Sequence, residues 1–157
     1  MQKFERAEFE VKEYVESEHY GKFVFEPLER GFGTTIGNAL RRGLLSSLPG
    51  AAVFAIKMDG VYHEFTAIPG VVEDVTAIIL NIKKLILKIA DDEVYTLRIS
   101  KRGPGEVRGS DIICPEGVEI LSKDHYICTL EEDGVLEMEL QARVGRGYVS
   151  ADTNKQL

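Results

Sequence analysis

The stretch from Glu26 to Gly50, EPLERGFGTTIGNALRRGLLSSLPG, limits the fold more than any other part of this 157-residue chain. A glycine-rich turn is followed by apolar residues at helical spacing, and the helical pattern stops at Pro49. The sequence therefore predicts a helix from about Thr35 to Leu48, with Thr34 or Thr35 supplying the side-chain cap at its start.

This predicted helix is apolar over more of its circumference than one core can use. At about 100° per residue the apolar arc covers roughly 240°, whereas an ordinary surface helix has an arc of about 100°. The arc consists of Ile36, Ala39, Leu40, Gly43, Leu44, Leu45 and Leu48. The helix is either fully buried in a core or shared between its own core and a partner chain. Arg41, inside the arc, favours sharing, because a guanidinium among leucines needs a carboxylate or carbonyl partner.

Composition narrows the class of protein. A 44% apolar content is enough for a core of one domain, or of one and a half. The formal net charge of -7 argues against a broad phosphate-binding surface, which needs clustered lysine and arginine. No apolar run reaches membrane-spanning length, and the N-terminus is too charged for a signal peptide. Together with only two cysteines, this predicts a cytoplasmic protein with reduced thiols.

Most of the remaining chain has the alternation typical of strands. Phe9–Glu16 and Tyr20–Glu26 are expected to pair as a hairpin, and so are Val53–Met58 and Val61–Ala67 around Asp59-Gly60. Further strands are expected at Leu85–Ile89, Val94–Ser100, Val118–Leu121, Tyr126–Glu131 and Val135–Ala142. A turn at 91–93 is expected to join the first two of these strands, and a turn at 133–134 the last two.

A second helix is predicted from Val75 to Leu85 or Ile86, with Glu73-Asp74 in its first turn and Lys83-Lys84 in its last, as the macrodipole prefers. Its β-branched residues make a strand the alternative. Lys101–Ser110 is expected to be a glycine-proline loop, and the polar tail from residue 150 is expected to fray. The predicted class is α+β, with mainly antiparallel sheets and two principal helices.

Three residue groups raise the question of a chemical site. Gly31, Gly33 and Gly37 precede or open the first helix and could cradle phosphate, which makes a small nucleotide-binding protein the alternative function. Their spacing matches neither common phosphate-binding motif and no lysine follows, so a structural turn is the simpler interpretation.

The other two groups are a possible zinc site and a possible acid–base pair. Cys114, His125 and Cys128 could be zinc ligands, but a fourth ligand is missing and core cysteines are the simpler interpretation. His63-Glu64 would point to opposite faces of a strand, so the two cannot act as an acid–base pair. Gly145–Tyr148 is either a contact anchor or a plain turn. We expect no catalytic residue, metal or cofactor in this chain.

Three segments carry a family resemblance. EPLERGFGTTIGNALRRGLLSSLPGAAV, MDGVYHEFTAIPGVVEDVTAIILNIKKL and GRGYV resemble, in the same order, the N-terminal domain of the bacterial RNA polymerase alpha subunit. The resemblance extends over nearly the whole chain. It implies a non-catalytic scaffold of a nucleotidyltransferase complex. In that family two alpha subunits pair through a dimerisation subdomain, and the dimer holds the beta and beta-prime subunits, whose magnesium site is not on alpha.

The resemblance also implies roles for residues and segments. Arg42 and Leu45 match positions that engage beta, and Lys83 matches a position linked to beta-prime. Residues 1–49 correspond to the first part of the dimerisation subdomain, and residues 50–157 to an inserted β-rich subdomain that includes Val53–Ala67 and the Gly145–Tyr148 loop. The candidate interface residues are Phe32, Leu40, Arg41, Arg42, Leu44, Leu45, Leu48, His63, Lys83, Arg146 and Tyr148.

The chain departs from the family pattern at three places. It stops at Leu157, where family members continue through a return segment of the dimerisation subdomain to a DNA-binding domain. DNA binding is therefore not expected of this segment, and homodimer formation would need the return segment. Gly43 replaces a common bulky aliphatic residue in the first helix, at a cost of about 1 kcal/mol relative to alanine. Ser150 stands where proline is usual. We expect the helix to expose apolar surface and the chain to self-associate.

Overall fold

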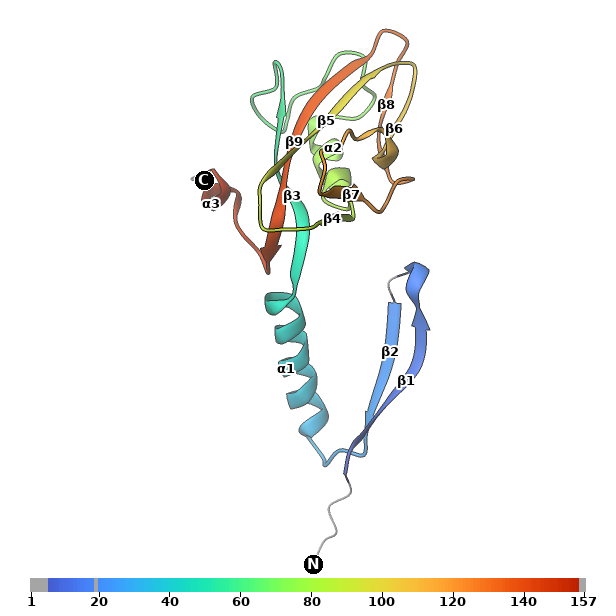
Figure 1. Cartoon of the computed structure of the whole chain (residues 1–157), viewed down its shortest axis with the longest axis vertical. Coiled ribbons are helices and arrows are strands. Elements are labelled where there is room, and N and C mark those ends of the chain that lie inside the picture. The colour runs from blue at the N-terminus through green and yellow to red at the C-terminus, as the bar shows by residue number, and fades with distance from the viewer. Residues whose placement is uncertain (1–5, 19, 156–157) are drawn as a thin grey trace, which may run out of the picture. The chain divides into compact units, whose positions relative to one another are not determined.

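The structure is a computed structural model that describes residues 6–18 and 20–155. The chain divides into two compact units, one up to Ser46 and one from Ser47 onward. The first unit contains β1 (Glu8–Val15), the short helix η1 (Glu16–Glu18), β2 (Tyr20–Glu26) and all but the last residue of α1 (Phe32–Ser47) (Figure 1).

The second unit holds the larger part of the chain. Its elements, in order, are β3 (Pro49–Met58), α2 (Val75–Ile82), β4 (Leu87–Ile89), β5 (Tyr95–Arg102), β6 (Gly105–Arg108), η2 (Gly109–Asp111), β7 (Val118–Ile120), β8 (Tyr126–Leu130), β9 (Val135–Arg146) and α3 (Ala151–Asn154). Every pair of strands is antiparallel within the described residues. The predicted α+β class with antiparallel sheets is confirmed.

The hairpin of β1 and β2 is the predicted one. Phe9 pairs with Phe25 and Val11 with Phe23, which places these four apolar side chains on one face, and the ladder shifts register between Val11 and Glu13. The Phe9 and Phe23 rings are stacked with centroids 5.4 Å apart. All four side chains are nevertheless exposed. The hairpin therefore has an apolar face that its own pairing does not cover.

Helix α1 begins at Phe32 rather than at the predicted Thr35. Gly31, with φ of 92°, turns the chain into the helix through a conformation that favours glycine. Thr34 and Thr35 lie inside the first turn, so the predicted threonine cap is wrong. All sixteen residues of α1 are described and none is buried. Within this chain, the interpretation of α1 as a fully buried core helix is therefore wrong.

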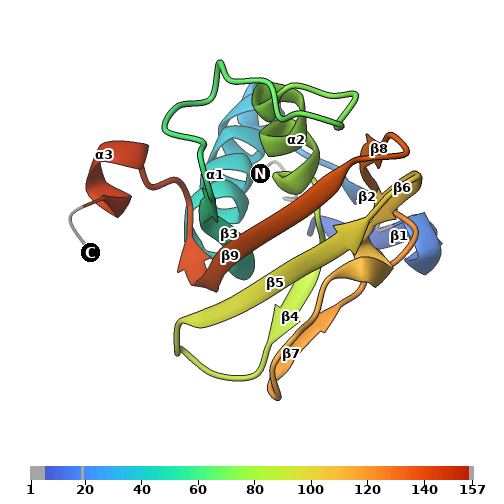
Figure 2. The ribbon, with the colours of Figure 1, turned by 90° about the horizontal axis from the view of Figure 1, so that it is seen from above.

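The second unit is built on a five-stranded sheet in the order β5-β9-β3-β4-β7. The long strand β9 pairs with β3 on one side and with β5 on the other. A bridge between Arg98 and Ile113 brings the segment before β7 to the β5 edge, while β7 itself lies at the opposite edge. One chain segment thus reaches both edges, and the sheet is curved and nearly closed (Figure 2). Strands β6 and β8 form a separate two-stranded sheet.

The core lies inside this curved sheet, where α2 packs against it. The alternation predicted for β5 and β9 is confirmed. Buried residues alternate with more exposed ones at Leu97 and Ile99 in β5 and at Leu136, Met138, Leu140 and Ala142 in β9. The largest fully buried side chains are Val75, Ile78, Leu97, Ile99, Val107, Ile127, Cys128, Leu130, Leu136 and Leu140. All of them belong to the second unit, which therefore carries the folded core of the chain.

The predicted return strand over Val61–Ala67 is wrong. The Asp59-Gly60 turn forms, with Val61 N–H bonded to Met58 O at 3.3 Å, but residues 61–67 make only one bridge, from Ala67 to Asp74. Side chains satisfy the carbonyls of this loop instead. Thr66 Oγ1 donates to His63 O at 2.9 Å, and Thr76 Oγ1 donates to Glu64 O at 2.8 Å. His63-Glu64 therefore lies in a loop, and β3 takes β9 as its partner.

Strand pairing differs from the prediction at two further places. Strand β5 pairs with β9 instead of returning along β4, and β8 pairs with β6 rather than with β9. The predicted loop Lys101–Ser110 contains the end of β5, all of β6 and the start of η2. Gly103 explains the tight turn between β5 and β6. A side chain there would lie 2.0 Å from Glu131 O, and Gly103 N–H donates to Gly134 O at 2.8 Å.

The second predicted helix is confirmed as α2, and the alternative of a strand is wrong. It ends at Ile82, before the predicted Leu85, so that Lys83 is its C-cap residue. The predicted place of Glu73-Asp74 inside the first turn is also wrong, because Asp74 is the N-cap and accepts from Ala77 N–H at 2.7 Å.

The tail expected to fray instead forms α3. Ser150 caps this helix by accepting a hydrogen bond from Thr153 N–H at 3.3 Å. Arg143 Nη2 donates to Asn154 Oδ1 at 2.9 Å, which ties α3 to β9. Residues 156–157, also part of the predicted tail, lie outside the described residues. No described helix is long and apolar enough to span a membrane.

Candidate subunit interface

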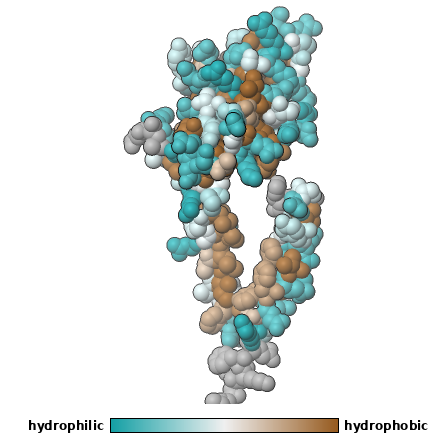
Figure 3. Space-filling model, in the orientation of Figure 1, coloured by the Kyte–Doolittle hydropathy of each residue, from teal (hydrophilic) through white to brown (hydrophobic). Residues whose placement is uncertain are grey.

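Helix α1 carries the largest set of predicted interface residues. Leu40 and Leu44 lie on α1, and Leu48 follows at the same four-residue spacing, one residue beyond the end of the helix at Ser47. Leu45 lies at the far border of the same arc. Each of these leucines is between 59% and 61% exposed, and Phe32 at the start of the helix is 54% exposed. Figure 3 shows apolar atoms running along the helix. An apolar surface of this kind on a folded chain typically marks a binding site.

Arg41 and Arg42 are both exposed on α1. Within the described part of the chain, neither guanidinium has an ion pair or a hydrogen bond. The carboxylate or carbonyl partner predicted for Arg41 is thus not supplied by these residues. Arg42 contributes only its carbonyl, which accepts from Ser46 Oγ at 2.6 Å. Two free guanidinium groups beside a leucine row suit recognition of an acidic patch on another chain.

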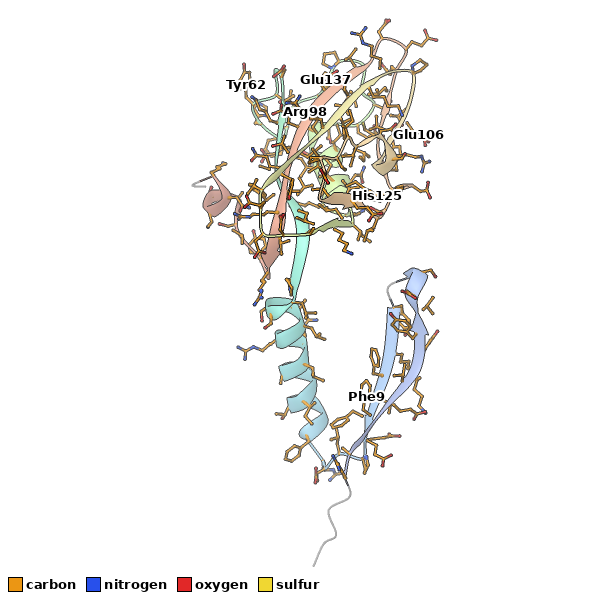
Figure 4. The ribbon with its side chains drawn as sticks, in the orientation of Figure 1. Phe9, Tyr62, Arg98, Glu106, His125 and Glu137 are labelled. Carbon is orange, nitrogen blue, oxygen red and sulfur yellow. The ribbon has the colours of Figure 1, made fainter. Side chains whose placement is uncertain are left out.

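A second apolar surface lies on the hairpin of β1 and β2, and the predicted interface set does not include it. It consists of Phe9, Val11, Phe23 and Phe25. Figure 4 shows Phe9 on this hairpin. The signal was present in the sequence, because Phe9 and Val11 alternate with charged residues in β1, and Phe23 and Phe25 are two positions apart in β2. Alternation predicts that one face is covered, but it does not say by which chain.

The loop between β3 and α2 exposes two aromatic residues on either side of His63-Glu64. Tyr62 is 94% exposed and Phe65 is 81% exposed, and Figure 4 shows Tyr62 pointing outward. The predicted contact residue His63 is also exposed, with Nδ1 3.2 Å from Thr66 Oγ1. This aromatic pair was not predicted from the sequence, because a strand was expected here. In a strand, residues three positions apart point to opposite faces.

Lys83 lies exposed at the C-terminal end of α2, next to the equally exposed Lys84. The turn that carries them is bonded to strand β8. His125 Nε2 donates to Asn81 O at 2.8 Å, and Asn81 Nδ2 donates to Ile127 O at 2.9 Å. Figure 4 labels His125 on the second unit, close to α2.

The N-terminal side of α2 is bonded to β8 as well. The Glu73 carboxylate accepts from Thr129 N–H at 2.8 Å and from the Tyr126 hydroxyl. Burial, and then the hydrogen bond to Glu73, raise the pKa of Tyr126. The sequence had no local signal for either set of bonds, because the partners lie more than 40 residues apart, at separations of 44 to 56.

Arg146 and Tyr148 lie at the end of β9 and just beyond it. Arg146 is exposed, and Tyr148 is 88% exposed after Gly147, whose φ is 62°. Before this loop, the Arg143 guanidinium lies 4.7 Å from the centroid of the Phe54 ring. Together with the bond from Arg143 to α3, this contact fixes both flanks of the loop. The loop therefore presents Tyr148 from a rigid base, as a contact anchor requires.

The outer face of β5 and β9 contrasts with these surfaces because two of its carboxylates contact side chains of the same chain. Arg98 forms a salt bridge with Glu139 at 3.1 Å, and Ser100 Oγ donates to Glu137 at 2.6 Å. Figure 4 labels Arg98 and Glu137 on adjacent strands.

The geometry does not assemble either of the chemical sites considered above. Gly33 and Gly37 lie inside α1, so that only Gly31 belongs to a turn and no glycine loop cradles an anion. Among the described residues, no group of three or more histidine, cysteine or acidic side chains could hold a metal ion. Cys128 is buried in the core, where burial and then the charge of Glu73 raise its pKa to about 12. His125 bonds to the backbone of α2 instead.

Comparison with known proteins agrees with the fold of the second unit. Residues 56–157 match the model of the RNA polymerase Rpb3/RpoA insert domain, and the chain belongs to this family. It is 55% identical over 155 residues to the DNA-directed RNA polymerase subunit alpha of Alkaliphilus metalliredigens, and 54% identical over 156 residues to that of Syntrophomonas wolfei. Each alignment covers 99% of this chain and 49% of the relative. The chain thus spans about half the length of the curated relatives it matches, and the predicted resemblance to the bacterial alpha subunit is confirmed.

Proposed function

We propose that this chain is a non-catalytic assembly scaffold of bacterial DNA-directed RNA polymerase, acting in transcription in the cytoplasm. In this role it pairs with a second alpha chain and holds the beta and beta-prime subunits. The observation that carries the proposal is the uncovered apolar arc of α1, in a chain whose relatives are named as alpha subunits. Both cysteines are free, as a cytoplasmic protein requires.

We assign the two kinds of contact on α1 to its two sides. Residues 1–49 act as the first part of the dimerisation subdomain, in which the row of Leu40, Leu44 and Leu48 faces the chain's own strands and the alpha partner. Leu45, on the other border of the arc, and Arg42, on the polar side beyond it, face beta. The apolar arc supports this division, because burying one leucine fully contributes roughly 1.5–3 kcal/mol.

Residues 50–157 act in this proposal as the inserted subdomain that extends the contact surface. Lys83 engages an acidic site on beta-prime, and His63, Arg146 and Tyr148 add contacts to the large subunits. Their exposure supports this assignment, as does the rigid backbone that carries Tyr148. The chain supplies no catalytic residue, metal or cofactor to the reaction.

Co-purification with the beta subunit tests the proposal. The chain is co-expressed with tagged beta, both as it stands and extended to the full length of its relatives. We expect beta to retain the extended chain, and we expect Arg42→Ala and Leu45→Ala each to reduce retention about tenfold, which corresponds to about 1.4 kcal/mol. Arg98→Ala, on the internally paired sheet face, is the control and should have no effect. If retention survives both substitutions on α1, the assignment of beta to that border is wrong.

A further inference from the structure

Helix α2 is too short to fix its own C-terminal end. It has eight residues, whereas an isolated helix shorter than about 12–15 residues is marginal in water. The last carbonyls of any helix also lack partners within the helix. The position of the turn that follows α2 therefore depends on groups from elsewhere in the chain.

The first of these groups is His125. Asn81 O accepts both Lys84 N–H at 3.0 Å and His125 Nε2–H at 2.8 Å, which closes the end of the helix. The neutral ring with its proton on Nε2 and the imidazolium both supply this donor. The Asn81 side chain makes a return bond to Ile127 O at 2.9 Å. Asn81 is thus attached to the segment around β8 through its backbone and its side chain.

The second attachment lies at the other end of the same turn. Ser122 Oγ accepts from Ile86 N–H at 2.9 Å, and Ile86 O accepts from Leu121 N–H at 2.9 Å. We call the contacts of Asn81 and Ile86 with residues 121–127 the α2 staple. Between its two attachments the side chains of Ile82 and Leu85 are buried, whereas those of the two lysines are exposed. The backbone of Lys83 and Lys84 is therefore held on both sides.

We infer that His125 and Ser122 are positioning residues for subunit attachment, and that the α2 staple presents Lys83 and Lys84 as a pre-oriented cationic pair to an acidic surface of the partner. This inference rests on the proposed function. A turn that is already ordered loses less conformational entropy on binding than a flexible one, so pre-orientation strengthens the contact without adding any new atom to it.

Amide hydrogen exchange of the full chain tests the staple without any partner. We expect His125→Ala to speed exchange at residues 83–86 about tenfold, while exchange in β5 and β9 stays unchanged. His125→Gln, whose side-chain amide nitrogen can replace Nε2, should restore slow exchange. Lys123→Ala removes an exposed lysine beside the staple and is the matched control. Unchanged exchange in His125→Ala would overturn the inference, whatever the partner is.

Capture by purified beta-prime, with the chain supplied in its alpha–beta subassembly, tests the consequence. Lys83→Ala is expected to weaken capture about tenfold, and His125→Ala should weaken it by a similar factor. The double variant should be captured no more weakly than Lys83→Ala alone, because both changes disrupt the same contact with beta-prime. Additive losses, or fast exchange with normal capture, would overturn the positioning role. If Lys83→Ala has no effect, the proposed attachment through Lys83 fails, and the exchange experiment alone decides whether the staple exists.

Discussion

The two principal helices of this chain both show apolar periodicity but have opposite environments. Helix α1 has sixteen residues, none of them buried, and its leucine row faces solvent. Helix α2 has eight residues, of which Val75, Ile78 and Ile82 are buried, and both of its ends are bonded to β8. Apolar periodicity thus identifies a face that must be covered, but it does not show whether the cover comes from the same chain.

The difference between the two helices is tested most strongly by shortening one apolar side chain on each. Ile78 is fully buried, so Ile78→Ala should reduce the free energy of unfolding by about 2–5 kcal/mol. Leu40→Ala, on α1, should change it by less than about 0.5 kcal/mol, while reducing self-association of the chain. Urea unfolding and light scattering measure the two effects. A large loss of stability for Leu40→Ala would show that α1 is covered within the chain.

The core of the second unit should also weaken at alkaline pH. The pKa of the Cys128 thiol is raised to about 12, from an ordinary value of 9.0. Above pH 9 the unfolded chain releases this proton while the folded chain keeps it, so the free energy of unfolding falls as pH rises from 9 toward 12. The stabilisation is complete below pH 9. Urea midpoints measured from pH 9 upward should fall, and Cys128→Ala should flatten this fall more than Cys114→Ala does.

Loss of a charge at the start of α2 should have a smaller effect than loss of core volume. Glu73→Gln weakens the bonds from Thr129 N–H and the Tyr126 hydroxyl, so we expect a loss of about 1–3 kcal/mol in the free energy of unfolding. Glu64→Gln changes an exposed carboxylate in the preceding loop and is the matched control. Urea unfolding at neutral pH gives both values. Equal losses for the two variants would mean that the Glu73 bonds do not hold α2 to β8.

The same contrast explains which parts of the fold the sequence can predict. Both helices, the β1–β2 hairpin and the alternation in β5 and β9 follow from local patterns, because each depends on residues only a few positions apart. The pairing of β8 with β6 does not, since the turn at Asp133-Gly134 indicates a reversal of the chain but not the strand that receives it. Residues 61–67 alternate like a strand, yet the hydroxyls of Thr66 and Thr76 bond the loop carbonyls instead.

The candidate interface divides in the same way. The leucine row of α1 and its arginines could be selected from spacing and composition, because the width of an apolar arc follows from residue positions along the sequence. The presentation of Lys83 could not be predicted, since His125 lies 44 residues from Asn81 and carries no local signal of that contact. Tyr62 and Phe65, both exposed, were missed because their segment was wrongly predicted to be a strand.

The smallest predicted effect concerns the side-chain cap at the start of each helix. Asp74 caps α2 by accepting from Ala77 N–H, so Asp74→Ala should cost about 1 kcal/mol of unfolding free energy. Thr35 lies inside α1, where alanine is a better helix former than threonine, so Thr35→Ala should be neutral or slightly stabilising. Circular dichroism during urea titration measures both. If Thr35→Ala cost as much as Asp74→Ala, then α1 would begin at Thr35 with a threonine cap. Phe32 would then precede the helix, and the exposed apolar face of α1 would lose its first residue.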